Sequence, residues 1–213
     1  MLGDDYQVQH APWDHDDGGA LDSKYGLRCL KLFLLTAMLE PTSYDVIIFN
    51  FGMHDINYNS KLPEEYTSPN DYTNNLKEIK STLLSTGAKL GYVFTTAIPY
   101  NNTLNVRIKQ YNSLASRVMK EYPAVETADL YSWVIEGCQN NCIVVDEDLL
   151  PHFTKKGYKY ISEKVKEFIL ELAQPQGVDE KQFSEGREKS LAIRLSSNTF
   201  QRGNLHQMVS KHS

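Results

Sequence analysis

The fold is decided by one stretch, YDVIIFNFGMHD, which covers residues 44–55. Its apolar run, Val46–Phe49, is unbroken and has polar residues on both sides, which is typical of a strand buried on both faces of a parallel sheet. Ligands of open α/β sheets bind outside the carboxyl ends of the strands. We therefore interpret the stretch as a central strand that delivers polar side chains to a site, with a core strand and an ordinary turn as the alternative. The polar cluster after the run consists of Asn50, Gly52, His54 and Asp55.

The chain has 213 residues and a formal net charge of −5. This length is enough for one domain with a substantial core, and the negative charge argues against a nucleic-acid-binding surface. No apolar run is long enough to span a membrane. The first ten residues, MLGDDYQVQH, lack the basic start and apolar core of a signal peptide. At face value this indicates a cytosolic protein, while secretion stays open if the natural N-terminus lies further upstream.

Three cysteines are present, and they support different expectations. Cys29 lies in a helical apolar pattern and is expected to be a small buried hydrophobic residue. Cys138 and Cys142 flank a short loop and could close a disulfide in an oxidising compartment or remain free thiols. Because no second Cys/His pair has suitable ligand spacing, no metal site is predicted, and no cofactor is indicated.

Predicted strands and helices alternate along the chain. Alternation of this kind predicts parallel βαβ units and an α/β fold, a three-layer αβα flavodoxin-like sandwich with a mostly parallel sheet. The predicted strands cover residues 6–11, 46–49, 89–96 and 125–130, and the predicted helices cover residues 21–39, 72–85, 105–121, 131–141 (a short helix and then the cysteine loop) and 154–172.

The segment 174–213 is polar, with few apolar residues and no sustained period. Such a segment cannot bury enough apolar surface to offset the entropy of ordering it. We therefore predict one folded domain over residues 1–173 and a disordered tail over residues 174–213.

Several stretches between residues 8 and 172 resemble, in the right order, the sequence blocks of the SGNH (GDSL-type) hydrolases. YDVIIFNFGMHDI resembles the family's third block, a buried strand that ends in Gly-x-Asn-Asp. PHFTKKGYKYISEKV resembles the last block, in which the catalytic His precedes a Phe-Thr-x-x-Gly-Tyr helix start. The other matching pieces are VQHAPWDHDDGG, YTNNLKEIKSTLLSTGAKLGYVFTTAIP, RIKQYNSLASRVM and AVETADLYS.

The resemblance implies a Ser-His-Asp mechanism for the hydrolysis of an ester or acyl bond. In this family a serine attacks the carbonyl, a histidine takes its proton, and an aspartate orients the imidazole. His152 matches the position of that histidine. The family's aspartate stands three residues earlier, where this chain has Leu149. Asp148 is therefore the expected orienting residue, with Asp146 as the alternative.

The resemblance also implies an oxyanion hole, which backbone N–H groups of the serine and a glycine form together with an Asn side chain. Gly19 is the expected glycine, with Gly18 as the alternative. His54 stands where the family's Asn usually stands, and an imidazole N–H can donate a hydrogen bond much as an amide does, with a pH dependence that Asn lacks. Gly52 and Asp55 belong to the same block and are expected in the oxyanion and substrate-binding group. A His54 that packs in the loop and pairs with Asp55 is the alternative.

The family's first block, a strand that ends in Gly-Asp-Ser, has no counterpart. GDD at residues 3–5 imitates its letters but lacks the strand before it and the helix after it, and neither Ser23 nor Ser43 follows a predicted strand. In a sheet of order 2-1-3-4-5 the first strand is interior. Its absence would leave the strands at 6–11 and 46–49 to pair directly or to expose their edges. Truncation is the favoured explanation, and true loss in a pseudoenzyme is the alternative.

These observations predict an SGNH-type ester or acyl hydrolase without its nucleophile block, so that the chain as it stands is expected to be inactive. The alternative is a non-catalytic module that binds a carbohydrate or lipid ligand. The expected partner is a small-molecule, glycan or lipid ester, and the residues do not indicate which. A flavodoxin-like nucleotide binder is set aside because no Gly-rich phosphate loop follows any predicted strand.

Overall fold

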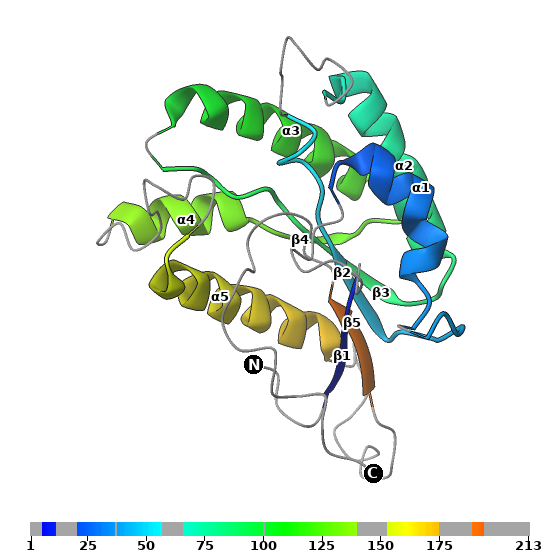
Figure 1. Ribbon diagram of the computed structural model, residues 1–213. Coiled ribbons are helices and arrows are strands. Elements are labelled where there is room, and N and C mark those ends of the chain that lie inside the picture. The colour runs from blue at the N-terminus through cyan, green and yellow to red at the C-terminus, as the bar shows by residue number, and fades with distance from the viewer. Residues whose placement is uncertain are drawn as a thin grey trace.

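The computed structural model describes residues 6–11, 21–36, 38–56, 66–99, 101–139, 153–174 and 189–193. A five-stranded sheet lies between two layers of helices (Figure 1). Every strand pair in the described sheet is parallel. The predicted three-layer α/β fold is thus confirmed.

The sheet has the strand order β1-β5-β2-β3-β4. In its centre Ile47 of β2 lies opposite Leu90 of β3 on one side and Ala192 of β5 on the other. The strands are β1 (Tyr6–His10), β2 (Val46–Phe49), β3 (Lys89–Val93), β4 (Glu126–Ala128) and β5 (Lys189–Ile193).

The strand β5 occupies the interior position that a 2-1-3-4-5 sheet gives to its first strand. It pairs with β1 from Tyr6↔Lys189 to His10↔Ile193 and with β2 from Val46↔Leu191 to Ile48↔Ile193. The expectation of a disordered tail is therefore wrong for residues 189–193. Neither do β1 and β2 pair directly, because β5 bonds to the main chain of both.

The helices divide between the two faces of the sheet (Figure 1). α1, α2 and α3 cover one face, and α4 and α5 cover the other. Their bounds are α1 Ser23–Phe33, α2 Pro69–Leu84, α3 Asn102–Lys120, α4 Leu130–Gln139 and α5 Lys155–Ala173.

The central strand β2 is buried on both faces, as its unbroken apolar run predicts. Successive side chains of a strand point to opposite faces, so Ile47 and Phe49 join the core under α1 to α3, whereas Val46 and Ile48 join the core under α4 and α5. On the second face α5 packs closely, because a Cβ at Gly91 of β3 would overlap the side chains of Ile48, Phe168 and Leu172.

Helix ends differ from the predicted ones where capping residues decide them. α2 begins at Pro69 because the Ser68 hydroxyl accepts from the Asp71 N–H, and proline is well suited to the first turn of a helix. α3 begins at Asn102 because the Asn101 side chain accepts from the Leu104 N–H. α1 ends at Phe33, short of the predicted residue 39, in a tight turn closed by an antiparallel bridge between Leu35 and Pro41.

Cys29 is partly buried and has a free thiol, and it packs at the margin of the core under α1 to α3. The question of a Cys138–Cys142 disulfide lies outside the described side chains. No helix in the described ranges is long and apolar enough to cross a membrane.

Candidate functional site

The candidate site lies at the carboxyl edge of the sheet, where β2 and β3 end. β2 continues into residues 50–56 and β3 into residues 94–99, and parallel strands place these two exits at the same edge. The two exits are bonded to each other, because Asn50 Nδ2 donates to the Val93 carbonyl at 2.6 Å. The sequence-based placement of the polar cluster at the end of the central strand is therefore confirmed.

One backbone carbonyl, that of Phe51, fixes the exit of β2. It accepts hydrogen bonds from Tyr72 Oη at 2.8 Å, Tyr92 Oη at 2.7 Å and Thr95 Oγ1 at 3.2 Å. All three donors are buried, and burial raises the pKa of both tyrosines above the ordinary value, so the phenols stay protonated at physiological pH. Buried polar groups bonded in this way hold the turn in one conformation.

Gly52 follows Phe51 directly, and the conformation of the backbone there requires a glycine. Its φ is +147°, in the range that residues with a side chain rarely adopt. A Cβ at this position would overlap Thr95 Oγ1, which the Phe51 carbonyl already engages. The Ile56 N–H donates to the Gly52 carbonyl at 3.1 Å and closes the turn. This conformation accounts for glycine at residue 52, and its predicted part in the oxyanion group stays a prediction.

Two asparagines of α3 clamp the exit of β3. The Asn112 side chain accepts from the Thr95 N–H at 2.9 Å and donates to the Thr95 carbonyl at 2.8 Å. Asn105 makes the same pair of bonds to the main chain of Ile98, at 2.9 and 2.8 Å. Each amide thus satisfies a loop residue as a neighbouring strand would, so the edge beside Gly52 is rigid.

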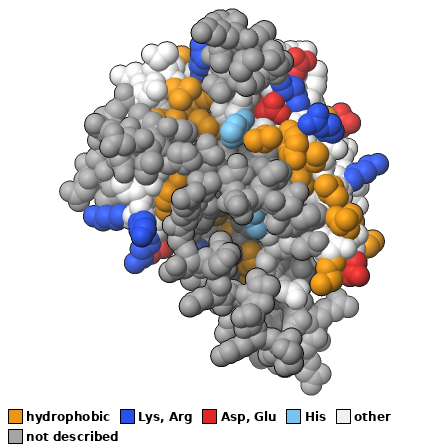
Figure 2. All heavy atoms as spheres, viewed as in Figure 1, with side chains coloured by type: hydrophobic (Ala, Val, Ile, Leu, Met, Phe, Trp, Pro, Cys, Tyr) orange, Lys and Arg blue, Asp and Glu red, His pale blue; other side chains and the backbone are white. Residues whose placement is uncertain are grey.

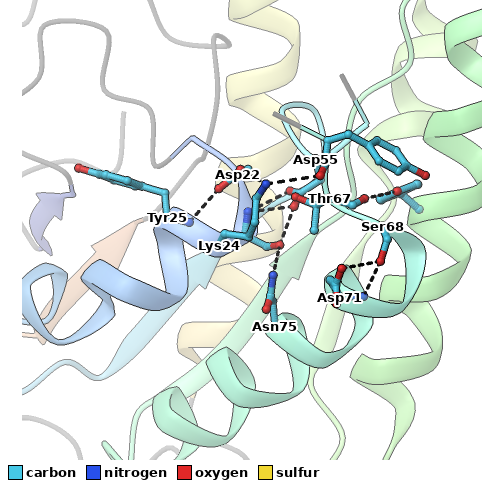
Figure 3. Close-up of polar contacts among 11 residues, drawn as sticks. Asp22, Lys24, Tyr25, Asp55, Thr67, Ser68, Asp71 and Asn75 are labelled. Atoms are coloured by element: carbon cyan, nitrogen blue, oxygen red, sulfur yellow. Dashed lines mark hydrogen bonds and ion pairs between the residues drawn. The ribbon is translucent and has the colours of Figure 1, made fainter. Parts of the chain in front are cut away.

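The Asp55 carboxylate is buried at 0% exposure, beside the amino end of α1. It accepts from the Ser23 N–H at 3.0 and 3.1 Å and from Ser23 Oγ at 2.5 Å. Asn75 of α2 donates to Ser23 Oγ at 3.0 Å, and the group is drawn in Figure 3. Asp55 was predicted among the substrate-binding residues, but its carboxylate points into the protein and supports α1. Ser23 is equally buried, which agrees with its exclusion as a nucleophile.

Burial raises the pKa of Asp55 to about 6, against the opposing effect of the Ser23 hydrogen bonds. An ordinary aspartate, and hence Asp55 in the unfolded chain, has a pKa of about 3.9. Between these two values the folded protein holds a proton that the unfolded chain has released, so raising the pH favours unfolding.

The free energy of unfolding is therefore expected to fall, through this one group, by about 2 kcal/mol as the pH rises from 4 to 7. The contribution is fully present below pH 4 and is lost by the time the pH has passed about 6. Urea unfolding of the wild type and of Asp55→Asn at both pH values isolates it, since other carboxylates cancel in the difference. Parallel pH dependence in the two proteins would contradict the prediction.

His54 lies in the same turn as Gly52 and Asp55, and its side chain is partly buried. Histidine surface is visible beside hydrophobic side chains in Figure 2. The other predicted site residues lie outside the described part of the chain. They are Gly18, Gly19, Asp146, Asp148 and His152. Within the described ranges no group of three or more His, Cys, Asp or Glu side chains could hold a metal ion.

The residues that hold the turn carry little signal in the sequence. Tyr72, Tyr92 and Asn112 sit in ordinary helix and strand patterns, and nothing local marks them as partners of the turn. Thr95 offered a weak signal, because it is a polar residue at the end of an apolar strand.

No protein-family profile matches the chain, and no curated protein matches it in sequence. Solved structures do match. A mutant of Axe2, an acetyl-xylooligosaccharide esterase from Geobacillus stearothermophilus, is 11% identical with a TM-score of 0.57 over 75% of this chain and 71% of that one. LAE5, an alpha/beta hydrolase enzyme from the metagenome of Lake Arreo, is 14% identical with a TM-score of 0.56 over 71% and 67%. At these identities the likeness concerns the fold, which is that of esterases and α/β hydrolases.

Proposed function

We propose that this chain is an ester hydrolase domain of the SGNH type. The observation that carries the proposal is the turn from Gly52 to Asp55, locked at the carboxyl end of the central strand by three hydroxyls on the Phe51 carbonyl. A site that stabilises an oxyanion needs donors fixed in advance of the reaction, and this turn is fixed in that way. The esterase fold of the structural neighbours supports the same interpretation.

In this proposal His54 donates an imidazole N–H to the oxyanion of the tetrahedral intermediate, in the role of the family's Asn. Gly19 supplies a backbone donor. His152 takes the proton from the attacking hydroxyl and returns it to the leaving oxygen, and Asp148 orients its imidazole. The substrate class to test first is an acetylated glycan, because the Axe2 neighbour is an acetyl-xylooligosaccharide esterase.

A second function, a non-catalytic module that binds a glycan or lipid ester, is favoured by the serines. Ser23 is buried and bonded to Asp55. Ser43 precedes β2 and therefore lies toward the amino edge, opposite the site. Neither of these two residues can act as the nucleophile in this structure.

A fluorophosphonate probe decides between the two functions, because it labels an activated serine wherever that serine stands in the chain. An active ester hydrolase predicts that the 213-residue chain is labelled at one serine other than Ser23 and Ser43, which peptide mass spectrometry identifies, and that it hydrolyses acetyl esters. A chain without its nucleophile block, as expected from the sequence, predicts neither reaction. His152→Ala should slow both reactions by at least about 100-fold, whereas His212→Ala, which is not among the proposed site residues, should not. Equal rates in both variants would remove His152 from the mechanism. Ester binding without labelling or hydrolysis would establish the non-catalytic module.

A further inference from the structure

The start of α3 carries a sequence motif that the proposed function does not use. Asn101, Asn102 and Thr103 form an Asn-x-Thr sequence, which is the acceptor sequence for N-linked glycosylation. It is the one Asn-x-Ser/Thr sequence in the 213 residues. Because three-residue motifs also arise by chance, the structure around the asparagine has to show whether the folded domain can carry a sugar there.

The Asn101 amide uses its oxygen in the fold and leaves its nitrogen available. Asn101 is the N-cap of α3, and its Oδ1 accepts from the Leu104 N–H at 3.0 Å. Its main-chain N–H donates to the Ile98 carbonyl at 3.1 Å. Neither bond involves Nδ2, and no hydrogen bond from Nδ2 reaches another residue in the described part of the chain. A sugar bonded to Nδ2 would leave the amide oxygen in place as the cap.

The surroundings of Asn101 have room for such a sugar. The side chain of Asn101 is partly exposed, and those of Asn102 and Thr103 are exposed. Asn105, four residues further along α3, shows the opposite case. It is 8% exposed, and its amide bonds to both the N–H and the carbonyl of Ile98. A sugar on Asn105 would find no space in a packed interior, so the motif falls on the one of these two amides whose nitrogen the fold does not need.

We propose that Asn101 is an N-glycosylation site and that the folded domain retains its sugar at the amino end of α3. In the transfer, Nδ2 of Asn101 bonds to C1 of an oligosaccharide that a lipid diphosphate carries. The bond from C1 to the diphosphate oxygen breaks, Nδ2 loses one proton, and the lipid diphosphate leaves, so nothing is oxidised or reduced. The inference is independent of the proposed ester hydrolysis, and it implies that the chain enters a secretory compartment.

The sugar would lie on the same edge of the sheet as the candidate site. Asn101 is bonded to Ile98 in the exit of β3, and that exit is joined to the exit of β2 through Asn50 and Val93. Connecting segments at this edge run over the surface of an α/β domain, which is where a bulky and strongly hydrated group is tolerated.

The test is production of the full chain behind a cleavable secretory leader in eukaryotic cells, followed by enzymatic removal of N-linked sugars in ¹⁸O water. We expect a glycosylated species that shifts to the size of the unmodified chain, with an ¹⁸O-labelled aspartate at residue 101 in peptide mass spectrometry. The cell lysate is analysed together with the medium, so that poor secretion does not hide the modification. A chain whose residue 101 is unmodified in both fractions would overturn the proposal.

Asn101→Asp is the matched variant, because a carboxylate caps a helix as well as an amide does but offers no Nδ2. The shift should disappear in this variant and in Thr103→Ala, which removes the hydroxyl that the acceptor sequence requires. Asn102→Gln keeps an Asn-x-Thr sequence and should be glycosylated like the wild type. A shift that persists in Asn101→Asp would place the sugar elsewhere and overturn the proposal.

Retention of the sugar by the folded domain is measured by urea unfolding of the glycosylated chain before and after the sugar is removed. Enzymatic removal converts Asn101 to an aspartate, which still caps α3, so both forms keep the bond to the Leu104 N–H. We expect the two unfolding midpoints to agree within the error of the measurement. A clearly lower midpoint with the sugar attached would show that the fold does not accommodate it, and would overturn this part of the proposal.

Discussion

A chain that ends at Gln174 is expected to lose the cooperative unfolding transition of the full-length protein, or to keep it at a far lower urea concentration. This truncation removes β5, which pairs with β1 over five residues and with β2 over three. The inner edges of both strands would then carry unpaired N–H and C=O groups in the middle of the sheet. The loss is expected to be on the order of 5 kcal/mol or more, comparable with the whole stability of a domain of this size.

A chain that ends at Asn198 is the control, since it keeps β5 and loses only residues on its carboxyl side. It should unfold at the same urea concentration as the full-length protein. The two truncated chains are compared by circular dichroism during urea unfolding and by the binding of a dye that reports exposed apolar surface. Identical transitions in the two chains would show that β5 does not contribute to the stability of the sheet.

The architecture could be predicted because its elements carry strong local patterns. The apolar run Val46–Phe49 predicts a strand buried on both faces, and all four residues are at most 2% exposed. The helical spacing of apolar residues in 154–172 likewise predicts α5, observed as Lys155–Ala173. Such patterns follow directly from which residues are buried, so they predict the element whatever other elements pack against it.

The strand β5 could not be predicted because its selection is not local. KSLAI is five residues long and lies in a polar segment, where periodicity gives almost no signal. What favours it as a strand is the open position between β1 and β2, which only the assembled sheet creates. The strand order 2-1-3-4-5 predicts an empty interior position beside β2, and the structure shows that a later segment, β5, occupies it.

The candidate site, like the fold, could be predicted only where the signal in the sequence is local. The polar cluster after β2 could be located because it follows the central strand directly. The residues that hold this cluster in place could not be located, because they are far away in sequence. Tyr72, Tyr92 and Thr95 are 21, 41 and 44 residues from the Phe51 carbonyl that they bind. Hydrogen bonds across such separations leave no periodicity in the sequence. Asp55 was assigned to the correct turn, but its burial against Ser23 depends on the packing of α1.

Gly52→Ala is expected to lower the free energy of unfolding by about 3 kcal/mol or more. Two effects combine at this residue. The φ of +147° is strained for any residue with a side chain. The new methyl group would also overlap Thr95 Oγ1, and Thr95 can yield only by giving up its bond to the Phe51 carbonyl at 3.2 Å. Urea unfolding at a fixed pH measures the change.

Gly87→Ala separates these two effects. Gly87 also has a positive φ, +79°, but a Cβ there meets nothing within 4 Å, so only the backbone term applies and about 1 kcal/mol is expected. Combining Gly52→Ala with Thr95→Ala removes the overlapping oxygen and should recover part of the loss, which appears as a favourable coupling energy in the double-mutant cycle. If Gly52→Ala and Gly87→Ala lower the free energy of unfolding by the same amount and the cycle shows no coupling energy, then Thr95 does not confine the turn. The rigid support that we assign to His54 would in that case have to come from the Ser23–Asp55 hydrogen bonds alone.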